Sequence, residues 1–511
     1  MPSSDNGQTK ATPARGPARS PARSRLPRPS NRLLGSLALT ALILASGGWA
    51  ALRHPAAALT PTTPSVAQLR TAVAHANIVL IVIDSARADH LGCYGYPRPT
   101  TPTIDRLAAH SITFTNHYCQ IPMTAASTAS LFTSQFPDTH GIFYQAPADW
   151  QPDFTLARAL SRAGFRTALF SSNPSASPAV GIGRDFAEAY HRTKPVDQGT
   201  SFSPKSLLIQ FDTWLRANRR SRFFAYLHLL PPHTPYNQPD RLTRLFDCPP
   251  PGYASCDYTP LQCDFPITGP YHRRPHPPLP DWINLYDANL RYADWAIGEI
   301  IAKLAAAGLL DATLLLITSD HGEAFGEHGY VWHVGAIHDE AAHIPLLIKF
   351  PGDAVTPHRI HSLTQTIDLL PTICDLLAIP YPRDSVQGSS LLPLLAGLAD
   401  TAAPYTITKS IGPAKYMIRD RDHSLLLYRD REHCALYDLR TDPSQRTDLA
   451  SQRADCAQRL RRIFRRYARA QRHPPVDFLD PNARPLPDPL PDPAALPPAL
   501  QRDIKTLGYL H

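Results

Sequence analysis

The chain lacks the features of a nucleic-acid-binding protein. Its formal net charge is +8 over 511 residues, but residues 1–32 hold seven Lys or Arg against the single Asp5, which leaves about +2 for the rest. No stripe of basic and aromatic residues follows in the central part. Because nucleic-acid binding depends on a concentrated basic surface, no nucleic-acid partner is expected.

The eight Cys include no CxxC pair, the spacing typical of a structural zinc site. Cys248, Cys256 and Cys263 instead lie close together in a Pro-rich insertion at residues 237–280. A zinc knuckle is the alternative, but the wide spacing favours a disulfide in an exported protein. The pairing does not follow from the sequence.

Charge is absent from residues 33–52, LLGSLALTALILASGGWAAL. Twenty apolar residues in a helix span roughly 30 Å, the thickness of a bilayer core. With a basic tail before it, this segment predicts a single membrane anchor that leaves the bulk of the chain periplasmic or otherwise extracytoplasmic. The alternative is a signal peptide cleaved near Ala56–Ala58.

Apolar, β-branched runs alternate with helical patterns in the following part of the chain. Predicted strands lie at 77–84, 166–172, 222–229, 312–320 and 344–350, and predicted helices at 102–110, 155–163 and 283–307. This alternation predicts an α/β fold with a large, mostly parallel sheet flanked by helices. Short strands from about 405 and a helix at 451–470 predict a small C-terminal α+β subdomain.

These patterns divide the chain into six parts. We expect a disordered basic tail (1–32), the anchor or signal peptide (33–52), a linker (53–75), a main domain (76–400) that contains the insertion, the C-terminal subdomain (401–475), and a Pro-rich tail with a terminal helix (476–511).

Polar residues stand where the predicted strands end. In parallel sheets, ligands bind beyond the carboxyl ends of the strands, so Asp84, His228, Asp320 and His321 are expected to converge. Carboxylates with an imidazole suit a divalent cation. Alone, the SDHGE segment around Asp320 is equally well explained as a turn.

Thr124 opens the small-residue run TAASTASLFTS, which predicts a helix. Its hydroxyl would lie at the helix N-terminus, where free N–H groups favour an anion. A metal-activated Thr there is a possible nucleophile, and an ordinary N-cap is the alternative.

Several segments in order resemble the sulfatase family of the alkaline phosphatase superfamily. They are NIVLIVIDSARADHLGCYGY, TPTIDRLAAHSITFTNHY, the Thr124 run with FPDTHG, AYLHLLPPHTPY and ITSDHGEAFGEHG, followed by LYDLRTDPSQRTDLA (436–450) and IKTLGYL (504–510).

The resemblance implies a catalytic main domain with one divalent metal ion. Its identity stays open among Mn, Zn, Ca and Mg. Its ligands would be Asp84, Thr124, Asp320 and His321. His228, His233 and His333 would face the anionic group or the leaving oxygen of a sulfate or phosphate ester. Each of the three histidines, and Asn173 as a further substrate ligand, also has an ordinary structural explanation. Arg87 and Asp89 match family positions too, but a structural ion pair or a cap explains them adequately.

The chain also departs from the family pattern. Sulfatases convert a Cys or Ser in C/S-x-P-x-R to formylglycine, whereas Thr124, Ala126 and Thr128 occupy these three places. Conversion is therefore not expected. Ser85 and His321 also replace the usual Asp and Asn, which resembles the Thr-dependent phosphoryl hydrolases and transferases of the superfamily.

Three functions follow from these observations. The first is hydrolysis of phosphate or sulfate esters by a metal-activated Thr124, with phosphoryl esters preferred. The second is a membrane-tethered transferase of the phosphoethanolamine or glycerol-phosphate type. The third is a catalytically silent member of the fold that binds an anion. The presence of all four predicted metal ligands favours the enzyme.

Overall fold

The computed structural model describes residues 63–143, 146, 150–191, 203–236, 238–246, 279–411, 414–428 and 433–475. The predicted anchor at 33–52, the three Cys of the insertion and the terminal helix lie outside these residues. Within the part that is described, no helix is both long and apolar enough to cross a membrane.

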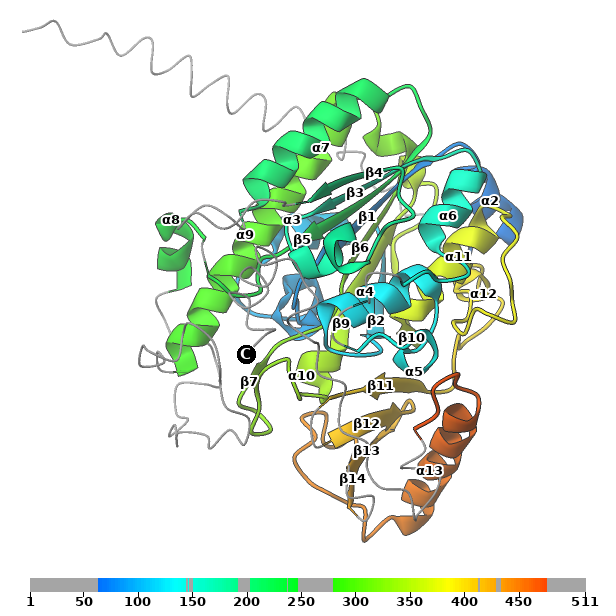
Figure 1. Cartoon of the computed structure of the whole chain (residues 1–511). Helices are drawn as coiled ribbons and strands as arrows, with labels where there is room; N and C mark the ends of the chain where they lie inside the picture. The colour runs from blue at the N-terminus through cyan, green and yellow to red at the C-terminus, as the bar shows by residue number, and fades with distance from the viewer. Residues whose placement is uncertain are drawn as a thin grey trace, which may run out of the picture. The chain divides into compact units, whose positions relative to one another are not determined.

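An eight-stranded sheet forms the main domain, in the order β10-β2-β9-β6-β1-β5-β3-β4 (Figure 1). Only β9 runs antiparallel to its neighbours within this sheet, so the predicted mostly parallel sheet is confirmed. The strands are β1 (Asn77–Ile83), β2 (Ile112–Tyr118), β3 (Arg166–Ser171), β4 (Glu188–His191), β5 (Phe223–Leu229), β6 (Thr313–Ser319), β9 (His343–Lys349) and β10 (His358–Gln365).

Helices cover both faces of this sheet. Every residue of β1 is buried, because Ile78, Leu80 and Val82 pack on one face and the alternate residues pack on the other. The first face is covered by α2 (Val66–Val73), α4 (Thr124–Thr133), α6 (Leu156–Arg162), α11 (Leu369–Leu376) and α12 (Leu392–Leu395), and the second by α3 (Pro102–Ala108), α7 (Pro204–Asn218) and α9 (Leu279–Ala306).

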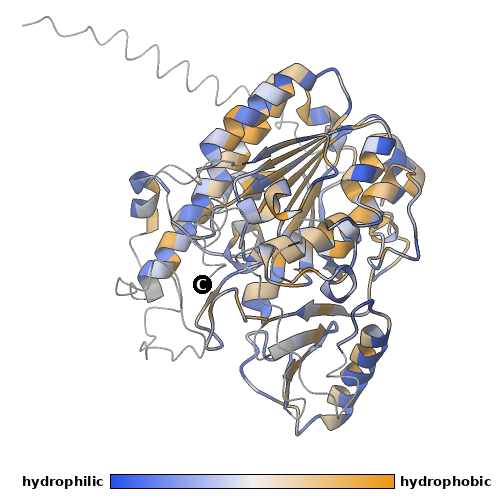
Figure 2. Ribbon diagram, in the orientation of Figure 1, coloured by the Kyte–Doolittle hydropathy of each residue, from blue (hydrophilic) through white to orange (hydrophobic). Residues whose placement is uncertain are grey.

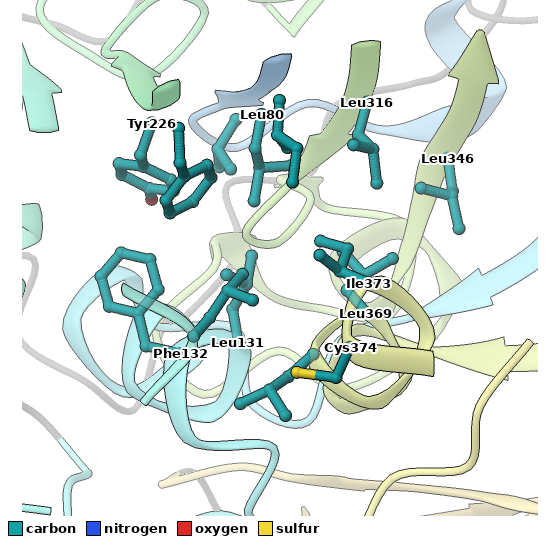
Figure 3. Packing of buried hydrophobic residues seen from close by; sticks show 14 of the residues in the cluster. Leu80, Leu131, Phe132, Tyr226, Leu316, Leu346, Leu369, Ile373 and Cys374 are labelled. Carbon is teal, nitrogen blue, oxygen red and sulfur yellow. The ribbon is translucent and has the colours of Figure 1, made fainter. Parts of the chain in front are cut away.

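The core on the first face fixes α4 against the sheet. In Figure 3, Leu131 and Phe132 of α4 lie beneath Leu80 of β1 and Tyr226 of β5. The centroids of the Phe132 and Tyr226 rings lie 4.9 Å apart. Because burial of each such side chain contributes roughly 1.5–3 kcal/mol, this packing holds the N-terminus of α4 in place. The figure also labels Leu316, Leu346, Leu369, Ile373 and Cys374.

A second, smaller sheet follows the main domain, in the order β11-β12-β13-β14. Its strands are antiparallel, and α13 packs on it through one apolar cluster, as predicted for an α+β subdomain. The elements are β11 (Thr406–Lys409), β12 (Ala414–Arg419), β13 (His423–Tyr428), β14 (Cys434–Asp438) and α13 (Ala454–Arg469).

Short elements complete the described chain. A two-stranded hairpin follows β6 and leads into a short helix before β9. These elements are α5 (Pro137–His140), α8 (Asp240–Thr243), β7 (Ala324–Phe325), β8 (Val331–Trp332) and α10 (Asp339–Ala342).

Candidate metal and catalytic site

Two aspartates follow the neighbouring central strands β1 and β6. The Oδ1 atom of Asp320 accepts backbone N–H groups from Ser85 (3.1 Å) and His321 (2.9 Å). Its Oδ2 atom is buried and has no hydrogen-bond partner among the described residues. Ser85 has a φ of 59°, an uncommon backbone conformation for a residue with a side chain. A buried carboxylate oxygen without a partner at this position is what a bound cation would satisfy.

His228 near the end of β5 faces both aspartates. Its Nε2 atom lies 3.3 Å from Asp84 Oδ2 and 3.7 Å from Asp320 Oδ2. The ligand atoms of the three residues all lie within 4.8 Å of one another. Its Nδ1 atom is 2.8 Å from the hydroxyl of Tyr226, which orients the ring. His228 therefore belongs to the candidate metal ligands as well as to the catalytic candidates.

His321 presents its Nε2 atom to the same centre. The Nδ1–H group donates to the carbonyl of Gly322 at 2.9 Å, which leaves the lone pair on Nε2. Nε2 lies 3.8 Å from Asp84 Oδ1, 3.6 Å from Asp320 Oδ2 and 3.4 Å from the Thr124 hydroxyl. A side chain at Gly322 would meet the Glu340 carbonyl at 2.1 Å, so only glycine fits there.

Thr124 is the first residue of α4 and is fully buried. Ser127, one turn on, donates its hydroxyl to the Asp320 carbonyl at 2.7 Å, which ties α4 to the end of β6. The free N–H groups and positive dipole at this helix end favour an anionic group. The hydroxyl of Thr124 therefore lies between a candidate metal centre and a helix N-terminus.

His333 and His233 extend the site beyond His321. The ring centroids are 4.2 Å apart for His321 and His333 and 5.2 Å apart for His233 and His333. Glu323 Oε1 lies 3.1 Å from Nδ1 of His333 and orients its ring. The side chains of all three histidines are buried.

Asn173 hydrogen-bonds to the metal-site carboxylate. Its Nδ2 donates to Asp84 Oδ2, and its Oδ1 accepts the N–H of Ser175 at 2.8 Å. The side chain thus also caps the short helix that follows it, which was the alternative to the predicted anion contact.

Burial and neighbouring charges shift the acidity of the cluster. Burial by itself raises the pKa of Asp84, but the imidazoles of His233, His228 and His321 outweigh it and hold this pKa well below its usual range. Burial and the charge of Asp84 raise the pKa of Asp320. Burial lowers the pKa of His321 to about 4, so this imidazole stays neutral and can act as a ligand. Burial also lowers the pKa of His333 to about 3 and raises that of Glu323 to about 8.

Arg87 makes the ion pair that its sequence context indicated. Its guanidinium contacts Asp89 at 2.8 Å and Glu327 at 2.5 Å, and it lies over the Phe325 ring. It thus joins the segment after β1 to the β7–β8 hairpin.

The structure brings all eight predicted site residues into one continuous set of contacts. They are Asp84, Thr124, Asn173, His228, His233, Asp320, His321 and His333.

Sequence reasoning missed two residues that orient histidines of the site. Tyr226 stands two residues before His228, on the same face of β5, so period-two alternation could have found it. Glu323 stands two residues after His321 in SDHGE, but nothing in the sequence pairs it with His333.

Comparison with known proteins shows the family of this chain. The model of the sulfatase family matches residues 76–379, which is more than half of the chain. The chain belongs to the sulfatase family. It is therefore an ester hydrolase of this family, whose members generally depend on a divalent metal. A second model, N-sulphoglucosamine sulphohydrolase, C-terminal, matches residues 326–467 and includes most of the small subdomain.

Curated sulfatases are similar to this chain over most of its length. An arylsulfatase of Clostridium perfringens is 24% identical over 73% of this chain and 90% of its own length. Iduronate 2-sulfatase of Homo sapiens is 27% identical over 64% of this chain and 70% of its own. Choline-sulfatase of Rhizobium meliloti is 26% identical over 73% of this chain and 82% of its own length.

Solved structures share the fold. One, in complex with its substrate D-glucosamine-2-N,6-O-disulfate, has a TM-score of 0.66 and 19% identity, and covers 80% of this chain and 100% of its own. The phosphonate monoester hydrolase of Agrobacterium radiobacter has a TM-score of 0.61 and 21% identity, and the match covers 77% of this chain and 96% of its own. Sulfatases and a phosphonate hydrolase thus share this fold.

The resemblance of the sequence to sulfatases predicts Thr124 at the place of the Cys or Ser that becomes formylglycine. Cys119 does not replace it, because its thiol is buried just after β2 and points to the Ala341 carbonyl at 3.7 Å. Burial raises the pKa of this thiol, which leaves it un-ionised.

Proposed function

We propose that this sulfatase-family enzyme hydrolyses sulfate or phosphate esters by attack of the Thr124 hydroxyl on the anionic group. The observation that carries the proposal is the place of this hydroxyl at the start of α4, 3.4 Å from Nε2 of His321. The next contacts of that nitrogen are Asp84 and Asp320. A hydroxyl at this point has the neighbours that a nucleophile needs.

The donor set fits one divalent cation, of which Mn, Zn, Ca and Mg all remain candidates. Asp84, Asp320 and His321 would hold it together with Thr124, and His228 lies close enough to join them. The buried, unpartnered Oδ2 atom of Asp320 supports this fit. Such a cation would favour ionisation of the Thr124 hydroxyl and neutralise charge on the ester oxygens.

The other residues position the ester and handle its protons. The N–H groups at the start of α4 hold the anionic group by hydrogen bonds. Because burial keeps the His333 imidazole neutral, the proton for the leaving oxygen comes from the pair of His333 and Glu323, in which Glu323 still holds its proton near neutral pH, and His233 lies beside this pair. Asn173 keeps the Asp84 carboxylate in place, although the family resemblance suggests a substrate contact as well.

Thr124 also favours phosphoryl over sulfuryl esters. A formylglycine hydrate has a second hydroxyl whose collapse to the aldehyde expels sulfate, whereas a sulfated Thr has none. A phosphorylated Thr is released by in-line attack of water on phosphorus. We therefore expect aryl phosphates to be hydrolysed faster than matched aryl sulfates.

The test is kcat/KM for matched aryl phosphate monoesters, phosphodiesters and sulfates, with Mn, Zn, Mg or Ca supplied in turn. Thr124→Ala should lose roughly a thousandfold or more on the best ester, and Thr124→Ser should retain part of the activity. Thr133→Ala removes a hydroxyl from the other end of α4, where it bonds to the Ala129 carbonyl, and serves as the control.

Two results would count against parts of this proposal. Full activity in Thr124→Ala would exclude Thr124 as the nucleophile. Faster turnover of the sulfate, abolished in Thr124→Ala, would reverse the phosphoryl preference and leave the nucleophile standing.

We further propose that the enzyme acts outside the cytoplasm, tethered by residues 33–52. The support is the uncharged run and the basic tail before it. Cells that express the full chain should keep it in the membrane fraction, with its bulk open to protease from outside. A soluble product that begins near Ala58 would show a cleaved signal peptide instead.

A further inference from the structure

Outside the basic tail at residues 1–32, the positive charge of the chain is concentrated in its small C-terminal subdomain. Residues 401–475 hold 16 Lys or Arg against 8 Asp or Glu, a net charge of +8 that equals that of the whole chain. Residues 33–400 hold 25 against 29 and are net negative. The catalytic region is thus acidic and the subdomain is basic.

Most of this charge lies on one helix. Residues 454–472, which are α13 and the three residues after it, contain seven Arg and a single acidic residue, Asp455. In Figure 2, α13 carries hydrophilic and hydrophobic residues in alternation along its length. The two kinds fall on opposite faces, because the helical repeat is about 3.6 residues.

The apolar face of α13 is already used. Leu460, Phe464 and Tyr467 are buried in the cluster that joins the helix to the small sheet. The opposite face exposes Arg459, Arg462, Arg465, Arg466 and Arg469. None of the exposed large hydrophobic residues of the described chain lies on this helix.

Few of these arginines form an ion pair with an acidic residue of the described chain. Arg459 pairs with Asp420, and Arg472 lies 3.6 Å from Asp153. No ion pair with a described residue involves Arg461, Arg462, Arg465, Arg466 or Arg469. Apart from Arg459, these exposed guanidinium groups can therefore reach a partner without breaking an ion pair with a described residue.

The spacing of the row works against the helix itself. Arg462 stands four residues before Arg466, and Arg466 stands three before Arg469, so neighbours on the same face have the same charge. Like charges at these spacings destabilise a helix. A polyanion bound along this face would neutralise the repulsion between the arginines and so stabilise the helix.

We propose that the exposed arginine face of α13 binds a linear polysaccharide that carries sulfate or phosphate groups. Arg459, Arg462, Arg466 and Arg469 form a row that rises about 15 Å along the helix, so an extended chain can contact several guanidinium groups at once. The planar fork of Arg matches sulfate and phosphate oxygens in pairs.

The observations favour a polysaccharide over a lipid surface. Helices that lie in a membrane interface bury their apolar face among the lipids. The apolar face of α13 instead packs on the small sheet, and its outer face offers only charge.

This inference rests on the proposed function only in the choice of anion. If the inference holds, the ester that is hydrolysed belongs to a polymer, or is carried by one, and is not a small free molecule. Binding is measured separately from turnover, so the failure of one idea does not decide the other.

The test uses the full chain with Thr124→Ala, so that the probe is not consumed. The probe is dextran sulfate of defined length, with uncharged dextran of equal length beside it. Arg462, Arg466 and Arg469 are replaced together by Gln, and in a second variant by Lys. The control replaces the exposed Arg162, Arg219 and Arg220 by Gln, which removes three charges elsewhere.

We expect the Gln variant to bind dextran sulfate at least about tenfold more weakly and with a shallower salt dependence. The control should stay within about twofold, and the Lys variant should lie between the two. With Thr124 present, kcat/KM on a small aryl ester should not change in the Gln variant. In the unsubstituted chain, dextran sulfate should protect the α13 arginines from phenylglyoxal, a readout that does not depend on how the variants fold.

Three results would overturn the inference. These are unprotected α13 arginines, an equal loss of affinity in the control variant, and a Gln variant that loses binding to anionic lipid vesicles but keeps dextran sulfate. The last result would mean that the face is a membrane surface.

Discussion

Two clusters in this enzyme have the same kinds of side chain but differ in how their carboxylates are hydrogen-bonded. Asp84, Asp320 and His228 hold their ligand atoms within 4.8 Å of one another, and Glu340, His328 and His338 do the same. On composition alone, both are candidate metal centres.

In the second cluster, the pair of His328 and Glu340 already has its protons placed by hydrogen bonds. Nδ1 of His328 lies 2.8 Å from Glu340 Oε1, and Nε2 lies 3.1 Å from the carbonyls of both Ser444 and Gln445. Both ring nitrogens therefore donate, which requires a charged imidazole. The His338 ring stacks on it at 3.7 Å with an angle of 3°. Lone pairs in two parallel rings do not converge on one ion.

The first cluster differs in its carboxylate, because both ring nitrogens of His338 in the second cluster also lack a hydrogen-bond partner among the described residues. Asp320 Oδ2 has no hydrogen-bond partner among the described residues, and the neutral His321 presents a lone pair. The comparison shows that an unpartnered carboxylate oxygen and converging lone pairs, rather than residue type, separate a candidate metal centre from a structural ion pair. The second cluster joins the loop after β7 to the segment after β14.

The largest expected effect comes from Asp320→Asn, which keeps the shape of the side chain and removes its charge. We expect kcat/KM to fall roughly a thousandfold and bound metal to be lost. The matched change in the second cluster, Glu340→Gln, should leave the metal content unchanged. Metal analysis and kinetics on the purified variants check this, and the comparison fails if Glu340→Gln removes the metal and Asp320→Asn does not.

Tyr226→Phe tests how the first cluster is oriented. It removes the hydroxyl 2.8 Å from Nδ1 of His228 and should lower metal affinity or activity by roughly 10–100-fold. Tyr416→Phe is the control, since that buried hydroxyl contacts Asp138 in a different part of the chain. Metal titrations measure the affinity of both variants. If Tyr226→Phe binds the metal as tightly as Tyr416→Phe, His228 does not belong to the ligand set.

His328→Gln tests the second cluster as a purely structural feature. It replaces a charged pair with Glu340 by a neutral contact and should reduce the free energy of unfolding by about 1–3 kcal/mol. Urea denaturation measures this loss. The metal content should equal that of the unchanged enzyme, and a drop would show that the second cluster also binds an ion.

The smallest effect concerns pH. Burial lowers the pKa of His328, but the hydrogen bond and charge of Glu340 and the two carbonyls outweigh it, so the folded pKa is raised. Its stabilisation is therefore fully present below the unfolded pKa of about 6.5 and is lost as pH rises through the folded value. The stability difference between the unchanged enzyme and His328→Gln should shrink as pH rises. A difference that grows with pH would contradict the assignment.

Burial on both faces made the central strands predictable. The β1, β5 and β6 sequences are continuous apolar runs, so their ends, and with them Asp84, His228 and Asp320, could be placed at one edge of the sheet. Strand β10 gave no such signal, because it is an edge strand with exposed residues among its first five.

Contacts that depend on loops could not be predicted. The pairing of His328 with Glu340 arises from the path of the chain between β7 and α10. The contact of His328 with Ser444 and Gln445 needs the small subdomain in its folded position. No periodicity in the sequence encodes either contact.

The most direct test of the account is to capture the covalent intermediate on Thr124. The metal-loaded enzyme is mixed with an aryl phosphate or aryl sulfate, quenched in acid during the first turnovers, digested and analysed by mass spectrometry. The account predicts one phosphoryl or sulfuryl group on Thr124, absent from Thr124→Ala and from enzyme stripped of metal. An active enzyme that carries the group on another residue, or an active Thr124→Ala, would contradict it.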